Sequence, residues 1–138
     1  MNNHLILLGD SIIDNNPYVR GTDLPVEKHL KKMLPDWSIE KRAIDGSVIE
    51  DVINLQLGDL TKGSPIALSA GGNNLLKSSG IIQDDAKMTF NQVMKTLKPV
   101  IESFEKDYEN LLNRIQSPAL CFTIYNPAFH HYDETNFM

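Results

Sequence analysis

The amino-acid sequence predicts a single α/β domain built around a parallel β-sheet. Four short runs, three of them apolar and one more polar, have the length of β-strands. Segments with helical periodicity separate these runs along the chain. Strands that alternate with helices form right-handed βαβ units, in which the strands run parallel. A chain of 138 residues without a linker, repeat or low-complexity tract is expected to form one domain over residues 1–138.

The four predicted strands differ in how polar they are. They span residues 4–8, 38–43, 65–69 and 120–124. Three of them are almost continuously apolar, as expected of strands that are covered on both faces. The run at 38–43 contains several charged side chains and fits a strand at the edge of the sheet.

The first two crossovers each contain one predicted helix. Residues 25–34 place their apolar side chains on one helical face, and Pro25 suits the first helical position. The second helix opens with Ser47 and Glu50, which form a capping box, and it extends to about Leu57.

A third and longer helical segment covers residues 85–115. Pro99 lies inside it, where the ring removes a backbone hydrogen bond and favours a kink or a split near Lys98. The apolar residues of this segment form one predicted helical stripe. They are residues 93, 94, 97, 100, 101, 104, 108, 111, 112 and 115.

Charge and composition argue against several kinds of partner. The net charge is −5 and no basic run is present, so neither nucleic acid nor an anionic membrane is expected to bind. No stretch approaches the roughly 20 apolar residues that span a bilayer. The first apolar run is too short for a secretory signal, which makes a cytoplasmic location the default expectation.

The cysteine content excludes a disulfide framework within the chain, because Cys121 is the single cysteine. It lies in an apolar run and is expected to be a small buried side chain. No pattern in the sequence points to a bound metal or another cofactor, so none is expected.

Small polar residues follow three of the four predicted strands. They are Gly-Asp-Ser at 9–11, Asp-Gly-Ser at 45–47 and Gly-Gly-Asn-Asn at 71–74. Because the carboxyl ends of parallel strands meet at one edge of a sheet, these motifs are expected to lie together where ligands bind. Acyl transfer needs a nucleophilic hydroxyl and hydrogen-bond donors aimed at an oxyanion, and the three motifs supply both.

Each motif also has a purely structural explanation. Ser11 with Asp14 has the spacing of a capping box, and Ser11 as a helix cap is as good an explanation as Ser11 as a nucleophile. Gly46 can supply a positive φ at the turn from strand to helix. Residues 71–74 have the composition of an ordinary turn. The convergence of all three motifs at one edge favours the functional interpretation.

The three motifs resemble the first three sequence blocks of the GDSL/SGNH hydrolases, and the resemblance covers residues 4–125. It implies a serine esterase in which Ser11 is the nucleophile. It also implies an oxyanion hole formed by the backbone N–H groups of Ser11 and Gly46 and by the side-chain amide of Asn73. The residues that would support these loops are Asp10, Gly72 and Asn74. The fold implied is a three-layer α/β/α, flavodoxin-like domain whose parallel strands have the order 2-1-3-4.

The sequence departs from the family pattern in two places. Asn74 occupies the position of an Asp, which is expected to change how that loop is braced. The Asp-x-x-His block that supplies the general base is not found, so the final strand and helix of the family are expected to be missing. The edge of strand 120–124 would then be open, beside an exposed apolar patch, and would invite a homodimer or a complementing C-terminal fragment.

Four histidines are candidates for the missing base. His4 begins the first strand, at the wrong edge of the sheet, and His29 lies among lysines in the first helix. His130 and His131 follow the fourth strand on the correct edge, close to Asp133, but adjacent histidines in a polar tail are more often simply exposed. A metal site at this pair is expected still less, because neighbouring side chains of an extended chain point to opposite sides.

The leading hypothesis is a hydrolase that acts on a small-molecule carboxylic (acyl or acetyl) ester, weakened in this chain by the absence of its histidine. One alternative is an inert binding module that retains the pocket. A nucleotide-binding or regulatory domain of the flavodoxin type ranks last, because the sequence contains no Gly-rich phosphate loop.

Overall fold

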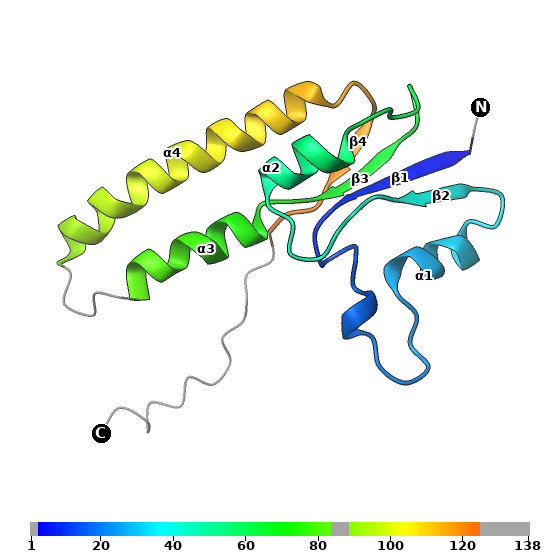
Figure 1. Cartoon of the computed structure of the whole chain (residues 1–138), viewed down its shortest axis with the longest axis horizontal. Helices are drawn as coiled ribbons and strands as arrows, with labels where there is room; N and C mark the ends of the chain where they lie inside the picture. Colours follow the sequence, from blue (N-terminus) through cyan, green and yellow to red (C-terminus); the bar gives the residue numbers. More distant parts are fainter. Residues whose placement is uncertain (1–2, 84–88, 125–138) are drawn as a thin grey trace.

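A computed structural model describes residues 3–83 and 89–124 and shows a four-stranded parallel sheet with helices on both faces (Figure 1). The strands are β1 (His4–Gly9), β2 (Ser38–Lys41), β3 (Ile66–Ser69) and β4 (Ala119–Cys121). Their order is β2-β1-β3-β4, and every neighbouring pair is parallel. The predicted α/β/α class and the predicted strand order are confirmed.

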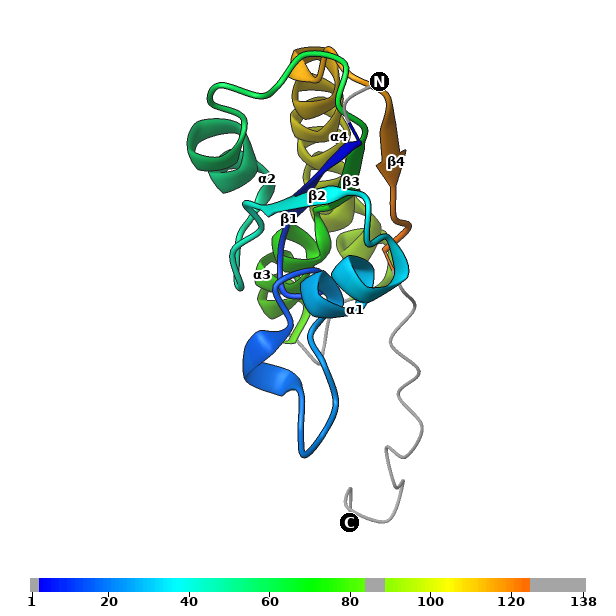
Figure 2. The ribbon, with the colours of Figure 1, turned by 90° about the vertical axis from the view of Figure 1, so that its right-hand side faces the viewer.

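The helices form two layers around this sheet. They are α1 (Val26–Met33), α2 (Ile49–Asp51), α3 (Gly72–Gln83) and α4 (Phe90–Arg114), with a 3₁₀ turn at Asn16–Tyr18 and a π-helical turn at Val52–Gln56. In Figure 1, α2 and α4 lie above the strands and α1 lies below them; Figure 2 gives the same molecule turned by 90°.

Alternate side chains of β1 pack against the two layers. Ile6 and Leu8 are fully buried in a cluster with residues of the α2 region and of α4. Leu7 belongs to the opposite cluster, which the half-buried Leu30 of α1 and the neighbouring Trp37 partly cover. Burial on both faces accounts for the continuous apolar character of this strand.

The helix after β2 has the predicted extent but not the predicted cap. It begins at Ile49, and its N-cap is Val48, whose backbone N–H donates to the Asp51 carboxylate at 3.0 Å. The predicted capping box of Ser47 and Glu50 is therefore wrong. The Ser47 hydroxyl is buried and faces inward, where it accepts a hydrogen bond from Gln56.

Helix α4 passes through Pro99 without interruption, so the predicted split is wrong. Pro99 is exposed and lies beyond the part of the helix that covers the sheet, where a missing backbone hydrogen bond is cheap because water can replace it. The buried stripe is also narrower than predicted. Leu111 is fully buried, whereas Met94 and Ile101 are exposed, because the first half of the helix extends past the strands (Figure 1).

Helix α3 was not predicted. It begins at Gly72, directly after β3, in a segment whose glycine and asparagine residues favour turns. The N-terminal turn of α3 carries both Asn73 and Asn74, so the third motif lies on a helix rather than in a loop.

Strand β4 lies at the edge of the sheet, as expected, and all three of its residues are exposed. Leu120 is 66% exposed and Phe122, one residue beyond the strand, is 44% exposed. The prediction that Cys121 is buried is wrong, because within the described residues no element covers the outer edge of β4. Among the described residues, no helix is long and apolar enough to cross a membrane.

Candidate active site

The end of β1 is held against β3 by Gly9. This residue has φ +127°, and a Cβ atom placed there would lie 1.8 Å from the Ser69 carbonyl oxygen. No side chain fits at this position, since the clash is with backbone. The next residue, Asp10, donates its N–H to the same Ser69 oxygen at 3.0 Å. The first motif is therefore fixed to the end of the neighbouring strand.

Asp10 shapes the turn that carries Ser11. Its buried carboxylate accepts hydrogen bonds from the Ile12 N–H at 3.1 Å and from the Ser69 hydroxyl at 3.0 Å. Its carbonyl oxygen accepts from the N–H groups of Ile13 and Asp14, which closes a tight turn. Ser11 lies half-buried in this turn, and no group in the described part of the chain hydrogen-bonds to its hydroxyl.

The structural explanation of Ser11 as a helix cap is wrong, because no helix begins at Ser11. Asp14 instead joins the first motif to the second. Its carboxylate binds the Lys41 ammonium and accepts the Asp45 N–H at 3.0 Å. The hydrogen bond from Lys41 lowers the pKa of the Asp14 carboxyl below its usual value. Tyr18 adds a second link, donating its hydroxyl to the Asp45 carboxylate at 2.9 Å.

Gln56 connects the first two motifs from inside the protein. Its side chain is fully buried; Oε1 accepts the Gly9 N–H at 2.7 Å, and Nε2 donates to the Gly9 carbonyl at 2.9 Å. Nε2 also lies 3.2 Å from the Ser47 hydroxyl. Sequence analysis missed this residue. The available signal was a glutamine on the apolar face that Ile49 and Val52 define in the same helix.

Asn73 connects the second motif to the third. Its Nδ2 donates to the Ser47 carbonyl at 2.9 Å. A side-chain amide has two N–H donors, and within the described residues the second one of Asn73 has no acceptor. Gly72 brings the start of α3 close to the first motif, since a Cβ there would lie 3.9 Å from the Asp10 carboxylate.

A small pocket of about 50 Å³ lies between the first and third motifs. Ser11 and Asn73 both line it, together with Asp10 and Gly72, so the structure brings these four predicted site residues together. Gly46 does not line the pocket. It lies in an exposed turn with φ +78°, which agrees with the structural explanation of this glycine.

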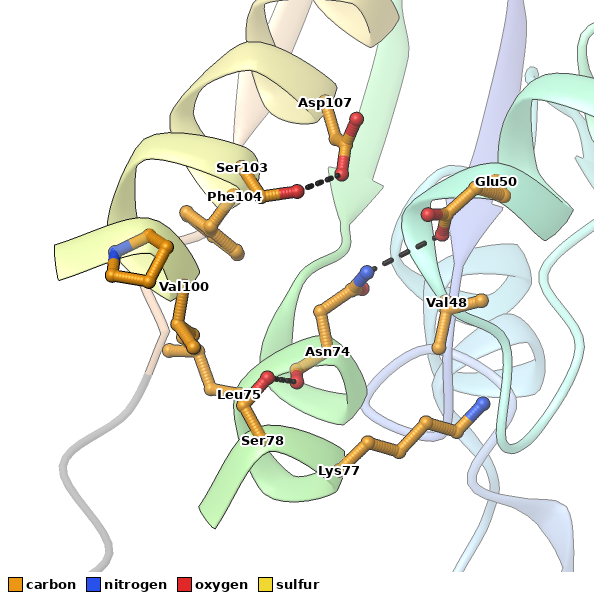
Figure 3. Close-up of a pocket in the computed structure, with 11 residues that line it drawn as sticks. Val48, Glu50, Asn74, Leu75, Lys77, Ser78, Val100, Ser103, Phe104 and Asp107 are labelled. Atoms are coloured by element: carbon orange, nitrogen blue, oxygen red, sulfur yellow. Dashed lines mark hydrogen bonds between the residues drawn. The ribbon is translucent and has the colours of Figure 1, made fainter. Parts of the chain in front are cut away.

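Asn74 points away from this pocket and into a second, larger groove of about 530 Å³ between α2, α3 and α4 (Figure 3). Its Oδ1 accepts the Ile49 N–H at 3.0 Å, and its Nδ2 donates to the Glu50 carboxylate at 3.3 Å. An Asp at position 74 could still accept the Ile49 N–H, but its carboxylate has no N–H to donate to Glu50. Asn74 is therefore expected to hold this segment differently from an Asp.

The larger groove lies on a different face of α3 from the Ser11 pocket. Leu75 and Ser78 of α3 line it opposite Ser103 and Asp107 of α4, as Figure 3 shows. Its polar groups largely satisfy one another: the Ser103 hydroxyl donates to Asp107 at 3.4 Å, and the Ser78 hydroxyl donates to the Asn74 carbonyl at 2.9 Å. None of the three strand-end motifs contributes a potential nucleophile to it.

The two described histidines lie away from Ser11. His4 stands at the start of β1, at the opposite edge of the sheet, with its Nε2 2.9 Å from the Glu40 carboxylate. His29 is exposed on α1. The other candidates, His130 and His131 with Asp133, lie outside the described residues. In the described ranges no cluster of three or more metal-ligating side chains occurs.

The fold is similar to that of two solved lipolytic enzymes. Phospholipase A1 from Streptomyces albidoflavus NA297 superimposes with a TM-score of 0.53 and 15% sequence identity, over 94% of this chain and 65% of that enzyme. The extracellular lipase from Streptomyces rimosus gives a TM-score of 0.53 and 13% identity, over 86% and 58% of the two chains. The chain thus spans less than two thirds of the length of either enzyme.

These similarities establish the fold, a three-layer α/β/α domain. No protein-family model matches the sequence. No curated protein matches it either.

Proposed function

We propose that this chain carries the nucleophile and the oxyanion-binding part of a serine esterase site that acts on carboxylic esters. The observation that supports this most directly is the shared pocket. Ser11, from the turn after β1, and Asn73, from the start of α3, line one cavity at the carboxyl edge of the sheet. The two solved enzymes with a similar fold are a phospholipase and a lipase, which agrees with ester chemistry.

In the proposed reaction, the Ser11 hydroxyl oxygen attacks the ester carbonyl carbon while its proton passes to a base. The carbonyl oxygen becomes an oxyanion, which would accept hydrogen bonds from the second Asn73 N–H and from the Ser11 backbone N–H. Collapse of this tetrahedral species breaks the bond to the alcohol, which leaves with the proton. Water then releases the acid from Ser11 by the same steps in reverse order.

The role of Gly46 stays a prediction. Its neighbour Ser47 is bonded to both Gln56 and Asn73, so the turn that contains Gly46 is tied to the pocket without lining it. A bound substrate would have to contact the Gly46 N–H from outside the cavity.

Labelling of the nucleophile tests the proposal. The chain should react with a fluorophosphonate, and mass spectrometry should locate the added mass on Ser11. Ser11→Ala should abolish labelling, whereas Ser38→Ala, at an exposed position at the other end of the sheet, should leave it unchanged. Labelling at another serine, or equal labelling of both variants, would refute Ser11 as the nucleophile.

One observation favours a second candidate function, a binding module without catalysis. The described residues place no base beside the Ser11 hydroxyl. A pocket of this kind can retain affinity for an ester without turning it over. Saturable ester binding by a chain that neither reacts with the fluorophosphonate nor hydrolyses nitrophenyl acetate would support the binding module.

A further inference from the structure

Four large apolar side chains surround the Ser11 pocket and remain exposed to solvent. They come from three separate elements, and we call them the apolar rim: Ile12, Leu76, Phe122 and Ile124. Their exposed fractions are 45%, 60%, 44% and 40%. Exposed apolar side chains that gather around a cavity are a mark of a binding surface.

The polar groups of the same pocket are few. Asp10 and Ser69 are bonded to each other, and one N–H of Asn73 is taken by the Ser47 carbonyl. Besides the second N–H of Asn73, the polar side-chain groups of the lining without a hydrogen-bond partner among the described residues include the hydroxyls of Ser11 and Thr123 and Oδ2 of the buried Asp10. A sugar ester fits this surface poorly, because its hydroxyl groups that face the apolar rim would lose water without gaining a partner from the protein.

The cavity itself is too small for a chain. The space open to the centre of a water molecule is about 50 Å³, a few times the roughly 10–15 Å³ that one water molecule needs on this measure, so the cavity admits a group of a few non-hydrogen atoms. It can hold the reacting carbonyl group and little more. Any longer substituent must therefore leave the cavity across the rim.

We propose that the preferred ligand of this site is an ester with an apolar chain of several carbons, and that this chain lies along Phe122 and Leu76 on the rim. The proposal rests on the proposed function in that it assigns the ester carbonyl to the Ser11 pocket. It adds the substrate class and the residues that select it. The chain contacts protein on one side and water on the other.

Because the apolar chain of the ligand contacts the protein on one side only, the gain in affinity for each added methylene group can be estimated. Full burial of one methylene group tightens binding about fourfold, so contact along one side tightens it about twofold. Affinity should thus rise about twofold for each added methylene, from butanoate to decanoate esters. An enclosed tunnel would give the steeper fourfold dependence.

The experiment uses the full chain carrying Ser11→Ala, so that esters bind without being consumed. Dissociation constants are measured by NMR titration for methyl alkanoates and, separately, for alkyl acetates, all below their aggregation concentrations. One of the two series should show the twofold dependence. That series identifies whether the chain on the rim belongs to the acid or to the alcohol.

Two variants on the same background locate the chain. Phe122→Ser should weaken the decyl ligand about tenfold and leave the shortest ligand within twofold. Met33→Ser is the control, because Met33 is an exposed apolar side chain on α1 that does not line the pocket, and it should change neither affinity. Leu76→Ser, on α3, provides a second test if the Phe122 variant does not fold.

Several results would overturn the inference. If affinity does not depend on the length of the ligand's alkyl chain in either series, the preference for an apolar ligand is refuted. If the dependence on alkyl-chain length remains in both rim variants, the alkyl chain does not lie along Phe122 and Leu76. Binding found only above the aggregation concentration would indicate contact with a lipid surface instead of a single chain. Hydrolysis of nitrophenyl acetate by the unsubstituted chain is measured separately, so failure of the proposed function is distinguished from failure of this inference.

Discussion

The side chain of Gln56 forms with Gly9 the same pair of hydrogen bonds that two opposed residues of antiparallel strands exchange. Oε1 accepts the Gly9 N–H at 2.7 Å and Nε2 donates to the Gly9 carbonyl at 2.9 Å. The Gln56 amide thus takes the place of a neighbouring strand for the last residue of β1, where the turn to Ser11 begins. Since Nε2 also donates a hydrogen bond to the Ser47 hydroxyl, one buried side chain links the first motif to the second.

Replacing Gln56 with leucine should destabilise the fold by about 1–3 kcal/mol. The substitution replaces the amide by an apolar side chain of similar size and leaves the buried Gly9 N–H without an acceptor, and the cost is the desolvation of that group. Urea unfolding provides the measurement. Asn54→Leu, at an exposed position of the same helix, is the control and should change stability by less than about 0.5 kcal/mol. Equal effects of the two substitutions would contradict this role of Gln56.

The pair of Asp14 and Lys41 predicts a pH-dependent contribution to stability. Because the hydrogen bond from Lys41 lowers the pKa of Asp14 in the folded chain, the pair stabilises the fold above the unfolded-state pKa of about 3.9. The contribution disappears as the pH falls through the lower, folded-state pKa. Asp14→Asn should therefore cost up to about 1 kcal/mol at pH 6, and this cost should shrink steadily as the pH falls below the unfolded-state pKa.

The check on Asp14 is urea unfolding of the original chain and the variant across this pH range. Asp23→Asn, at an exposed loop position, supplies the reference for removal of a carboxylate without a side-chain partner among the described residues. A cost for Asp14→Asn that is the same at pH 6 and pH 3 would show that the ion pair is not its source.

Asn74→Asp restores the residue that the family resemblance implies and should destabilise this particular chain. The new carboxylate would face Glu50, to which the present amide donates at 3.3 Å, and two like charges in contact repel. We expect a loss of about 0.5–1 kcal/mol at pH 7, relieved when Glu50→Gln is added. Unfolding free energies of the two single variants, the double variant and the original chain measure the coupling. Strict additivity would mean that Asn74 and Glu50 do not interact.

External imidazole should accelerate ester hydrolysis if Ser11 lacks only a base. The chain alone should hydrolyse nitrophenyl acetate feebly, several powers of ten below an intact serine hydrolase. Added imidazole should raise the rate of the original chain above that of Ser11→Ala measured in the same buffer, which corrects for direct hydrolysis by imidazole. Rapid turnover without imidazole would instead point to His130 or His131, or to a histidine of a second copy.

The open edge of β4 predicts association through this strand. Its residues are exposed, none of the other described strands pairs with its outer edge, and Leu120 presents an apolar surface there. Sedimentation should show dimers whose fraction grows with concentration, and Leu120→Lys should restore the monomer. Met33→Lys, at an equally exposed position on α1, should not. A stable monomer at every concentration would refute association at this edge.

The sheet could be predicted from the sequence because three of its strands lie in short apolar runs bounded by turn residues, and the more polar β2 has the composition of the edge strand that it forms. The strand ends position the polar motifs, so Ser11 and Asn73 line one pocket as expected, whereas Gly46 does not line it. Helix α3 could not be predicted, since Gly72 and the two asparagines favour turns and tertiary packing overrides that preference.

The hydrogen-bond and ion-pair partners of the side chains were less predictable from the sequence than the places of the residues in the fold. Asp14 has the spacing of a helix cap but binds Lys41, which is remote in sequence and adjacent only once β1 and β2 have paired. The inward position of Gln56 follows the apolar spacing of Ile49 and Val52, but its partner Gly9 is 47 residues away and is adjacent only in the folded chain.

Gly9 of the first motif and Gly46 of the second differ in which other amino acids each position can accept. At Gly9 any Cβ meets a carbonyl oxygen of the adjacent strand, so this position is closed to all other amino acids while β1 and β3 remain paired. At Gly46 a Cβ would meet nothing within 4 Å, and only the positive φ favours glycine, a preference that asparagine or aspartate also satisfies. Distant members of this lineage should therefore be sought with an invariant glycine before the Asp-Ser pair and with Gly, Asn or Asp admitted at the second position.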